Sequence, residues 1–237
     1  MMSGKSWGYV VQFFCLLVFL GMSPFLIKMD GRKTRSVSSD SVRSQNVSDE
    51  VKPVVALTFD DGPNASSTPI LLDGLKERKV RATFFLIGEN VEKDENEKIV
   101  KRMYEEGHLI GNHTYTHCNL SKLETGEAKK ELEQTDTVIE KITGKQPVFA
   151  RAPYGELPVD SEQDLNRIYI GWTVDPLDWM TEDVSRITQS VLEKVEPGDI
   201  ILLHDSYLSS VQAALRIVDA LQGKGYEFIT VDQMISD

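Results

Sequence analysis

The sequence is poor in cysteine and carries no surplus of positive charge. The first shortage argues against a fold held by disulfides, and the second argues against nucleic-acid binding. Only two of the 237 residues are cysteine, Cys15 and Cys118, and they lie far apart. We expect no disulfide between them, so the fold must be stable without a covalent cross-link. Acidic residues outnumber basic ones by 37 to 26, which gives a net charge of −11. This balance argues against nucleic-acid binding, because phosphate contacts need clustered Lys and Arg.

One long apolar run lies near the N-terminus, from about Gly8 to Ile27. It has no formal charge, and as a helix of roughly 20 residues it would match the hydrocarbon thickness of a bilayer. Lys5 could supply the basic start of a cleaved signal peptide, but no clear small-residue cleavage site follows the run. We therefore expect residues 1–28 to be an uncleaved signal anchor, with a signal peptide as the alternative.

Residues 29–51 are polar and rich in serine, and they have almost no apolar side chains to bury. Such a composition predicts a flexible linker. From residue 52 to residue 237, apolar segments typical of strands alternate with amphipathic segments typical of helices. This alternation predicts one α/β domain with a mainly parallel sheet. The expected strands are Val54–Phe59, Ala82–Ile87, Val148–Ala150, Ile168–Thr173, Ile200–His204 and Phe228–Val231.

Start and stop signals flank the expected helices. Thr68 followed by Pro69 is typical of a helix start, with Thr68 as the N-cap. An apolar stripe between residues 128 and 142 predicts a helix that ends at Gly144, and Ser121 with Glu124 resembles a capping box ahead of it. A second stripe, between residues 211 and 221, predicts a helix that ends near residue 223.

Two groups of residues suggest a metal site. Asp60 and Asp61 follow the first expected strand, and adjacent carboxylates repel each other unless a cation or an arginine compensates. Asp-Gly-Pro is also ordinary turn chemistry. His113 and His117 have the i, i+4 spacing that places two imidazoles on one side of a helical turn, where they can bind one metal. Asp60 or Asp61 could supply a third ligand, while Cys118 is expected to be a small buried residue.

Three further motifs lie at or after the ends of expected strands: RAPYG at 151–155, DPLDW at 175–179 and LLHD at 202–205. Arg151 stays charged and can hold a carboxylate, although a turn with a surface arginine would look the same. His204 beside an acid could be a general acid or a capped core histidine.

In this order, TFDDGP, HTYTH, RAPYG, DPLDW and LLHD resemble the five motifs of polysaccharide deacetylases with a NodB homology domain, carbohydrate esterase family 4. The resemblance extends from about Val54 to the C-terminus. It implies an α/β fold, a distorted (β/α) barrel with fewer than eight regular strands. It also implies a divalent metal cofactor, most often Zn²⁺, with Co²⁺ or another divalent ion as alternatives.

The resemblance implies that the first two motifs supply the metal ligands and the catalytic base, and that Arg151 positions the base. Asp61, His113 and His117 would hold the metal, and Asp60 would be the catalytic base. Arg151 would pair with Asp60 and hold it in position.

The remaining motifs would supply the acid and the acetyl pocket. His204 would be the general acid, with Asp178 orienting it and Arg81 joining the Asp178 network. Tyr154 would donate its backbone N–H to the oxyanion. The residues that would line the substrate pocket are Tyr154, Trp179 and Leu202.

The substrate expected from this organisation is the N-acetylglucosamine of peptidoglycan, because a membrane tether with a spacer would place the domain beside a bacterial cell wall. Chitooligosaccharides and acetylated xylan are alternatives, and a non-catalytic glycan-binding surface protein is the alternative from another class. Basic residues between Lys28 and Arg35 would place the domain in the cytoplasm by the positive-inside rule alone. The implied substrate instead requires a single-pass membrane protein with an extracytoplasmic domain, or a secreted protein if the anchor is cleaved.

Overall fold

A computed structural model describes residues 52–93, 95–158 and 167–236 of the chain. The expected signal anchor and the expected linker lie outside the described residues. Within the described part, no helix has the length and apolar character that a membrane crossing requires.

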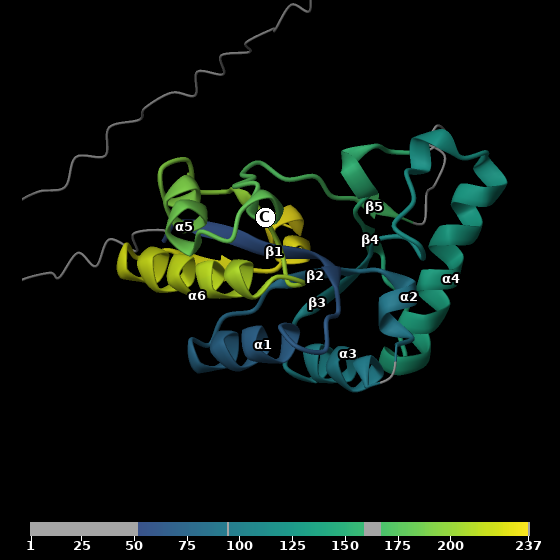
Figure 1. The fold of residues 1–237 in the computed structure, drawn as a ribbon, viewed down its shortest axis with the longest axis horizontal. Helices are drawn as coiled ribbons and strands as arrows, with labels where there is room; N and C mark the ends of the chain where they lie inside the picture. Colours follow the sequence, from purple (N-terminus) through teal and green to yellow (C-terminus); the bar gives the residue numbers. More distant parts are fainter. Residues whose placement is uncertain (1–51, 94, 159–166, 237) are drawn as a thin grey trace, which may run out of the picture. The chain divides into compact units, whose positions relative to one another are not determined.

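Seven parallel strands form one sheet in the order β5-β4-β3-β2-β1-β6, and β7 also pairs with β1. Helices surround this curled sheet (Figure 1), which confirms the expected distorted (β/α) barrel. The strands are β1 (Val54–Gly62), β2 (Thr83–Leu86), β3 (Leu109–Asn112), β4 (Phe149–Ala150), β5 (Ile168–Tyr169), β6 (Ile200–His204) and β7 (Glu227–Ile229).

The helices connect successive strands, and Figure 1 shows α1, α3 and α6 together on one side of the sheet. The α-helices are α1 (Thr68–Glu77), α2 (Gly88–Val91), α3 (Asn96–Glu105), α4 (Thr125–Thr143), α5 (Val184–Leu192), α6 (Leu208–Gly223) and α7 (Val231–Ser236). Short 3₁₀ segments are η1 (Leu120–Lys122), η2 (Pro153–Gly155) and η4 (Asp178–Met180).

Alternate residues of β1 face two different environments. Leu57 and Phe59 belong to the apolar core between the sheet and the helices. Thr58 and Asp60 have the opposite parity, so they face the other side of the sheet. The register pairs Asp60 of β1 with His204 of β6. The fold thus places a carboxylate and an imidazole side by side at the carboxyl end of neighbouring strands.

The same inner side is apolar near the start of the strands. Ala56, Phe85, Ile170 and Val231 form a separate buried cluster, and Val231 is the first residue of α7. On this side, Asp60 and His204 therefore lie beyond the apolar cluster, toward the carboxyl ends of the strands.

Several details differ from the sequence-based expectations. Strand β3 was not among the expected strands, and the expected strand Ile168–Thr173 is only two residues long. The expected capping box is wrong: Ser121 lies in η1, its hydroxyl donates to Glu156, and α4 begins at Thr125. The first helix is offset by one residue, because Ser67 is the N-cap of α1. The helix end at Gly144 is confirmed, with a left-handed φ of 73° there.

Candidate active site

Asp60 and Arg151 form a buried ion pair, with 2.9 Å between Asp60 Oδ1 and an Arg151 terminal nitrogen. Arg151 also donates to Thr58 Oγ1 at 2.8 Å and to the carbonyl oxygens of Ile170 and Gly171. The guanidinium carbon lies 4.3 Å from the centre of the Phe85 ring. Arg151 is 1% exposed, so the alternative of a surface arginine in a turn is excluded. The network fixes the Asp60 carboxylate in one orientation.

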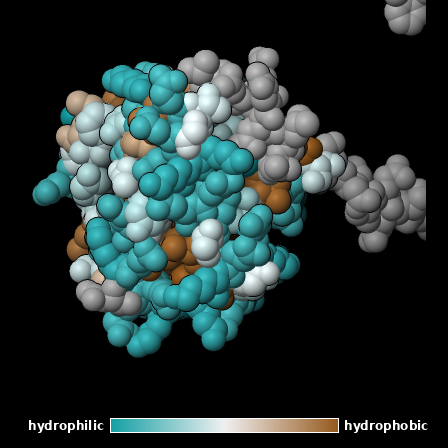
Figure 2. All heavy atoms as spheres, turned by 90° about the vertical axis from the view of Figure 1, so that its right-hand side faces the viewer, coloured by the Kyte–Doolittle hydropathy of each residue, from teal (hydrophilic) through white to brown (hydrophobic). Residues whose placement is uncertain are grey.

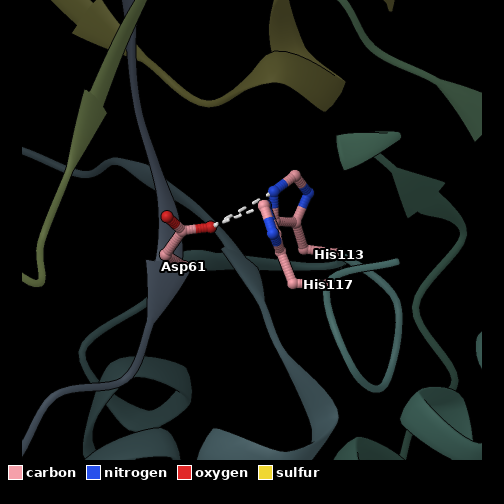
Figure 3. Close-up of side chains that lie close together, drawn as sticks. All are labelled: Asp61, His113 and His117. Carbon is pink, nitrogen blue, oxygen red and sulfur yellow. Dashed lines mark ion pairs between the residues drawn. The ribbon is translucent and has the colours of Figure 1, made fainter. Parts of the chain in front are cut away.

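Asp61, His113 and His117 converge at the end of β1 (Figure 3). Asp61 Oδ1 lies 3.4 Å from His113 Nε2 and 3.3 Å from His117 Nε2, and the three potential ligand atoms lie within 4.8 Å of one another. These distances leave space for an ion between the three atoms. Asp61 Oδ1 is buried and has no hydrogen-bond partner, as expected of an oxygen that a cation completes.

The donor set also suits a divalent metal. His113 Nδ1 lies 2.7 Å from the Arg151 carbonyl oxygen, which can only accept, so Nδ1 carries the proton. The Nε2 lone pair therefore faces Asp61. Burial raises the pKa of Asp61, but its interactions with His113, His204 and His117 more than offset this, and the net pKa is lowered. An anionic carboxylate and neutral imidazoles are the forms that bind zinc-type ions.

The two histidines do not lie on a helical turn, so that expectation is wrong. His113 follows β3, and the chain then loops back with left-handed backbone angles at Thr114 (φ 66°) and His117 (φ 59°). The ring centroids of the two histidines are 5.1 Å apart. Loop geometry rather than helical spacing brings the pair together.

His204 and Asp178 form a second dyad. Asp178 Oδ1 lies 2.8 Å from His204 Nδ1, and Oδ2 accepts the His204 backbone N–H at 2.8 Å. Burial lowers the pKa of His204, but the bond to Asp178 and the surrounding carboxylate charges outweigh it and raise the pKa to about 9. His204 Nε2 points toward Asp61, with 3.9 Å to Oδ2. The imidazole of His204 therefore lies beside the group of Asp61, His113 and His117, with Nε2 directed toward Asp61.

The three residues expected to line the substrate pocket differ in their exposure. Tyr154 has a φ of 62°, is 67% exposed and stacks edge-on against the ring of His117 at 5.0 Å. Trp179 is 53% exposed and follows Asp178 in η4. Leu202 is buried and pairs with Thr58 in the register of β6 on β1. Of the three, Tyr154 places an aromatic ring directly beside His117.

Two further expectations concerned the single residues Arg81 and Cys118. Arg81 lies two residues before β2, is exposed, and lies against Gly107, so it is not in the Asp178 network. The prediction was wrong because the start of a parallel strand lies at the opposite end of the sheet from the active site. Cys118 is a partly buried free thiol whose pKa is raised by burial, and it is not part of the Asp61, His113 and His117 group.

Asp205 is a site residue that sequence reasoning left without a role. It is fully buried, accepts a hydrogen bond from Thr68 Oγ1, and burial raises its pKa to about 7. Its carboxyl lies so close to Gly62 that a Cβ there would come within 2.5 Å. The Ser67 hydroxyl donates to the Asp205 carbonyl oxygen. Asp205 thereby fixes the turn that follows Asp60 and Asp61, and only its place beside His204 in LLHD could have suggested this.

Comparisons with known proteins agree with this geometry. A family model described as polysaccharide deacetylase matches residues 48–170. A peptidoglycan-N-acetylglucosamine deacetylase of Bacillus cereus is 42% identical over 190 residues, which are 77% of this chain and 68% of that protein. The peptidoglycan-N-acetylmuramic acid deacetylase PdaC of Bacillus subtilis is 38% identical over 194 residues, which are 82% of this chain and 41% of PdaC.

Solved structures give the same result. The structure of PdaC from Bacillus subtilis has a TM-score of 0.75 and 38% identity, and the match covers 78% of this chain and 91% of that one. A family 4 acetyl xylan esterase from Clostridium thermocellum, in complex with a cobalt ion, has a TM-score of 0.72 and 32% identity, with 77% of this chain and 90% of that one covered. The chain belongs to the polysaccharide deacetylase family, carbohydrate esterase family 4. It is a hydrolase of a metal-dependent deacetylase class.

Proposed function

We propose that this enzyme removes the N-acetyl group from N-acetylglucosamine units of peptidoglycan and releases acetate. The observation that carries the proposal is the convergence of a held carboxylate, a protonated histidine and a three-residue ligand set at one end of the sheet. Relatives named peptidoglycan-N-acetylglucosamine deacetylases, at 36 to 42% identity, support this substrate. A chitooligosaccharide deacetylase of Bradyrhizobium, at 37% identity, makes chitin oligomers the second candidate.

Asp61, His113 and His117 would hold the metal, and the two imidazoles with one carboxylate favour Zn²⁺. Co²⁺ is the alternative, since it accepts the same donor types. When bound, the ion makes a coordinated water more acidic, with a pKa toward about 7.

Asp60 is the proposed general base. Its Oδ1 is held by Arg151, while its Oδ2 lies 3.7 Å from His113 Nε2 and faces the ligand set. A carboxylate held in this way can accept a proton from a nearby water without rotating away. The backbone N–H of Tyr154 would donate to the oxyanion that forms from the acetyl carbonyl.

His204 is the proposed general acid. An amide cannot expel its nitrogen as an anion, so the leaving amine must receive a proton. With a pKa raised to about 9, His204 is protonated at neutral pH, and Asp178 holds Nδ1 so that Nε2 is the donating atom. Leu202 and Trp179 would contact the acetyl methyl group.

The location is also part of the proposal. Peptidoglycan lies outside the cytoplasm, so we propose that residues 1–28 act as a single-pass anchor and hold the catalytic domain there. If these residues are instead a cleaved signal peptide, the enzyme is secreted. Membrane fractionation combined with N-terminal sequencing of the mature protein distinguishes the two.

The test uses the full-length chain, stripped of metal and then reloaded with Zn²⁺ or Co²⁺. It is incubated with N-acetylated peptidoglycan, chitin oligomers and acetylated xylan, and released acetate and new free amines are quantified. We expect metal-dependent release, fastest on peptidoglycan, and a loss of about 10²–10⁴-fold in Asp60→Asn with metal binding retained. Faster release from chitin or xylan would overturn the substrate, and no release from any substrate with metal bound would favour a glycan-binding protein.

A further inference from the structure

The loop that joins the two histidine ligands is tied to helix α4 through one carboxylate. Glu131 Oε2 accepts the backbone N–H groups of Tyr115 at 3.0 Å and Thr116 at 2.8 Å. Glu131 Oε1 accepts the hydroxyl of Thr116 at 3.1 Å. Three donors from two consecutive residues therefore converge on a single side chain, and bonds to a charged acceptor are about twice as strong as neutral ones.

The loop needs such support because its backbone is strained at both ends. Thr114 has a φ of 66° and His117 has a φ of 59°, and non-glycine residues hold such left-handed angles only where their surroundings compensate for the strain. Helix α2 supports the opposite side of the loop: the N–H groups of Gly88 and Glu89 donate to the carbonyl oxygens of Thr114 and Tyr115, each at 3.0 Å. The loop is thus held between α2 and Glu131.

The two ligands depend on this support to different degrees. His113 is fixed through its own ring, because Nδ1 donates to the Arg151 carbonyl oxygen. The ring of His117 instead packs edge-on against the exposed ring of Tyr154. The position of His117 Nε2 is therefore set mainly by its backbone, which follows directly after the Tyr115–Thr116 segment that Glu131 holds.

We propose that Glu131 is a positioning residue that preorganises the loop from His113 to His117 and thereby raises the affinity of the site for a divalent cation. The inference rests on the proposed metal site and concerns a residue that none of the five motifs contains. Glu131 is not one of the three proposed metal ligands, and it acts through His117.

The test compares Glu131→Ala with Glu133→Ala in the full-length chain. Glu133 lies on the same helix two residues later, is exposed, and only pairs with Lys129 at 3.5 Å. Zn²⁺ affinity is measured by competition with a chromophoric chelator, and the visible spectrum of the Co²⁺ form reports the ligand geometry. We expect Glu131→Ala to bind Zn²⁺ about 10–100-fold more weakly, with an altered Co²⁺ spectrum, as for other residues that support metal ligands. Glu133→Ala should bind like the wild type.

Glu131→Gln keeps the shape of the side chain and removes its charge, so it serves if the alanine variant does not fold. Its affinity should be intermediate between the wild type and the weakened site. Equal affinity in the wild type and in every Glu131 variant that folds would overturn the inference while leaving the deacetylase function intact. If the wild type itself bound neither ion, the proposed function would fail first.

Discussion

The two ends of the parallel sheet differ in what they do with polar side chains. At the carboxyl end, Asp60, Asp61 and His204 lie within reach of one another and of two more histidines. At the amino end, the inner side of the sheet is filled by an apolar cluster that α7 contributes to. The catalytic end thus concentrates charge that the structural end excludes.

One histidine from each end makes the difference concrete. His204 hydrogen bonds to Asp178, and its pKa is raised to about 9 despite its burial. His108 is also buried, but its Nδ1 accepts the backbone N–H of Ala82 and its ring lies edge-on to Phe84. Burial dominates there and lowers the pKa of His108 to about 4. Both histidines are largely buried, so the carboxylate partner of His204 is what distinguishes this catalytic histidine from the structural His108.

The largest effect is expected when a charge at the catalytic end loses its partner. Arg151→Met leaves Asp60 buried and unpaired, which should lower the free energy of unfolding by about 3–5 kcal/mol and abolish measurable acetate release. Arg78→Met is the matched control, because Arg78 pairs with Asp219 at 2.7 Å on the surface. Removing that exposed pair should cost less than about 1 kcal/mol. Urea unfolding checks both, and equal losses would contradict the distinction between the buried and the exposed pair.

A steric change at the same end should have a smaller effect. In Gly62→Ala the new Cβ would lie 2.5 Å from the Asp205 carboxyl, and such overpacking costs about 1–3 kcal/mol. Activity should also fall, because the turn carries Asp60 and Asp61. Gly126→Ala is the control, since nothing lies within 4 Å of a Cβ there and alanine favours a helix. A Gly62→Ala protein with wild-type melting temperature would show that Asp205 can move freely.

Much of the catalytic end could be predicted from the sequence because the motifs lie at or after the carboxyl ends of strands. Parallel strands bring their carboxyl ends to one edge, so ordered motifs become neighbours whatever the loops between them do. The amino end had no such signal. Strand β3 was missed because Leu109 and Ile110 are its only large apolar residues. Arg81 was misplaced although it precedes the expected strand Ala82–Ile87, because the start of a parallel strand lies at the opposite end of the sheet from the motifs.

The supporting residues could not be predicted for a different reason. The hydroxyl of Thr68 reaches Asp205 across 137 positions of the chain, and Glu131 meets Tyr115 only because α4 packs beside the loop. Neither contact can be predicted from local sequence patterns. The i, i+4 spacing of His113 and His117 was equally compatible with a loop, and the left-handed angles that form the loop occur at a threonine and a histidine rather than at glycine.

Asp178→Asn should make the catalytic histidine resemble the structural one. Since Asp178 raises the folded-state pKa of His204 to about 9, this histidine adds stability below its ordinary pKa of 6.5, and that stability is lost as the pH rises through 9. In the variant this alkaline loss should largely disappear, and the basic limb of the pH–rate profile should shift to lower pH. NMR titration of the histidines checks the shift, with His108 as an internal control that should not move. An unchanged basic limb would mean that another group governs it.

His108→Asn should produce the smallest effect and one of opposite sign. The folded-state pKa of His108 is lowered to about 4, so its contribution to stability is full above 6.5 and is lost as the pH falls toward 4. Asparagine can still accept the Ala82 N–H through its side-chain oxygen but does not titrate. The variant should therefore show a smaller drop in melting temperature than the wild type between pH 7 and pH 5, with unchanged kcat at pH 7. If both proteins lost the same stability on acidification, the acid sensitivity would have to come from the catalytic end instead.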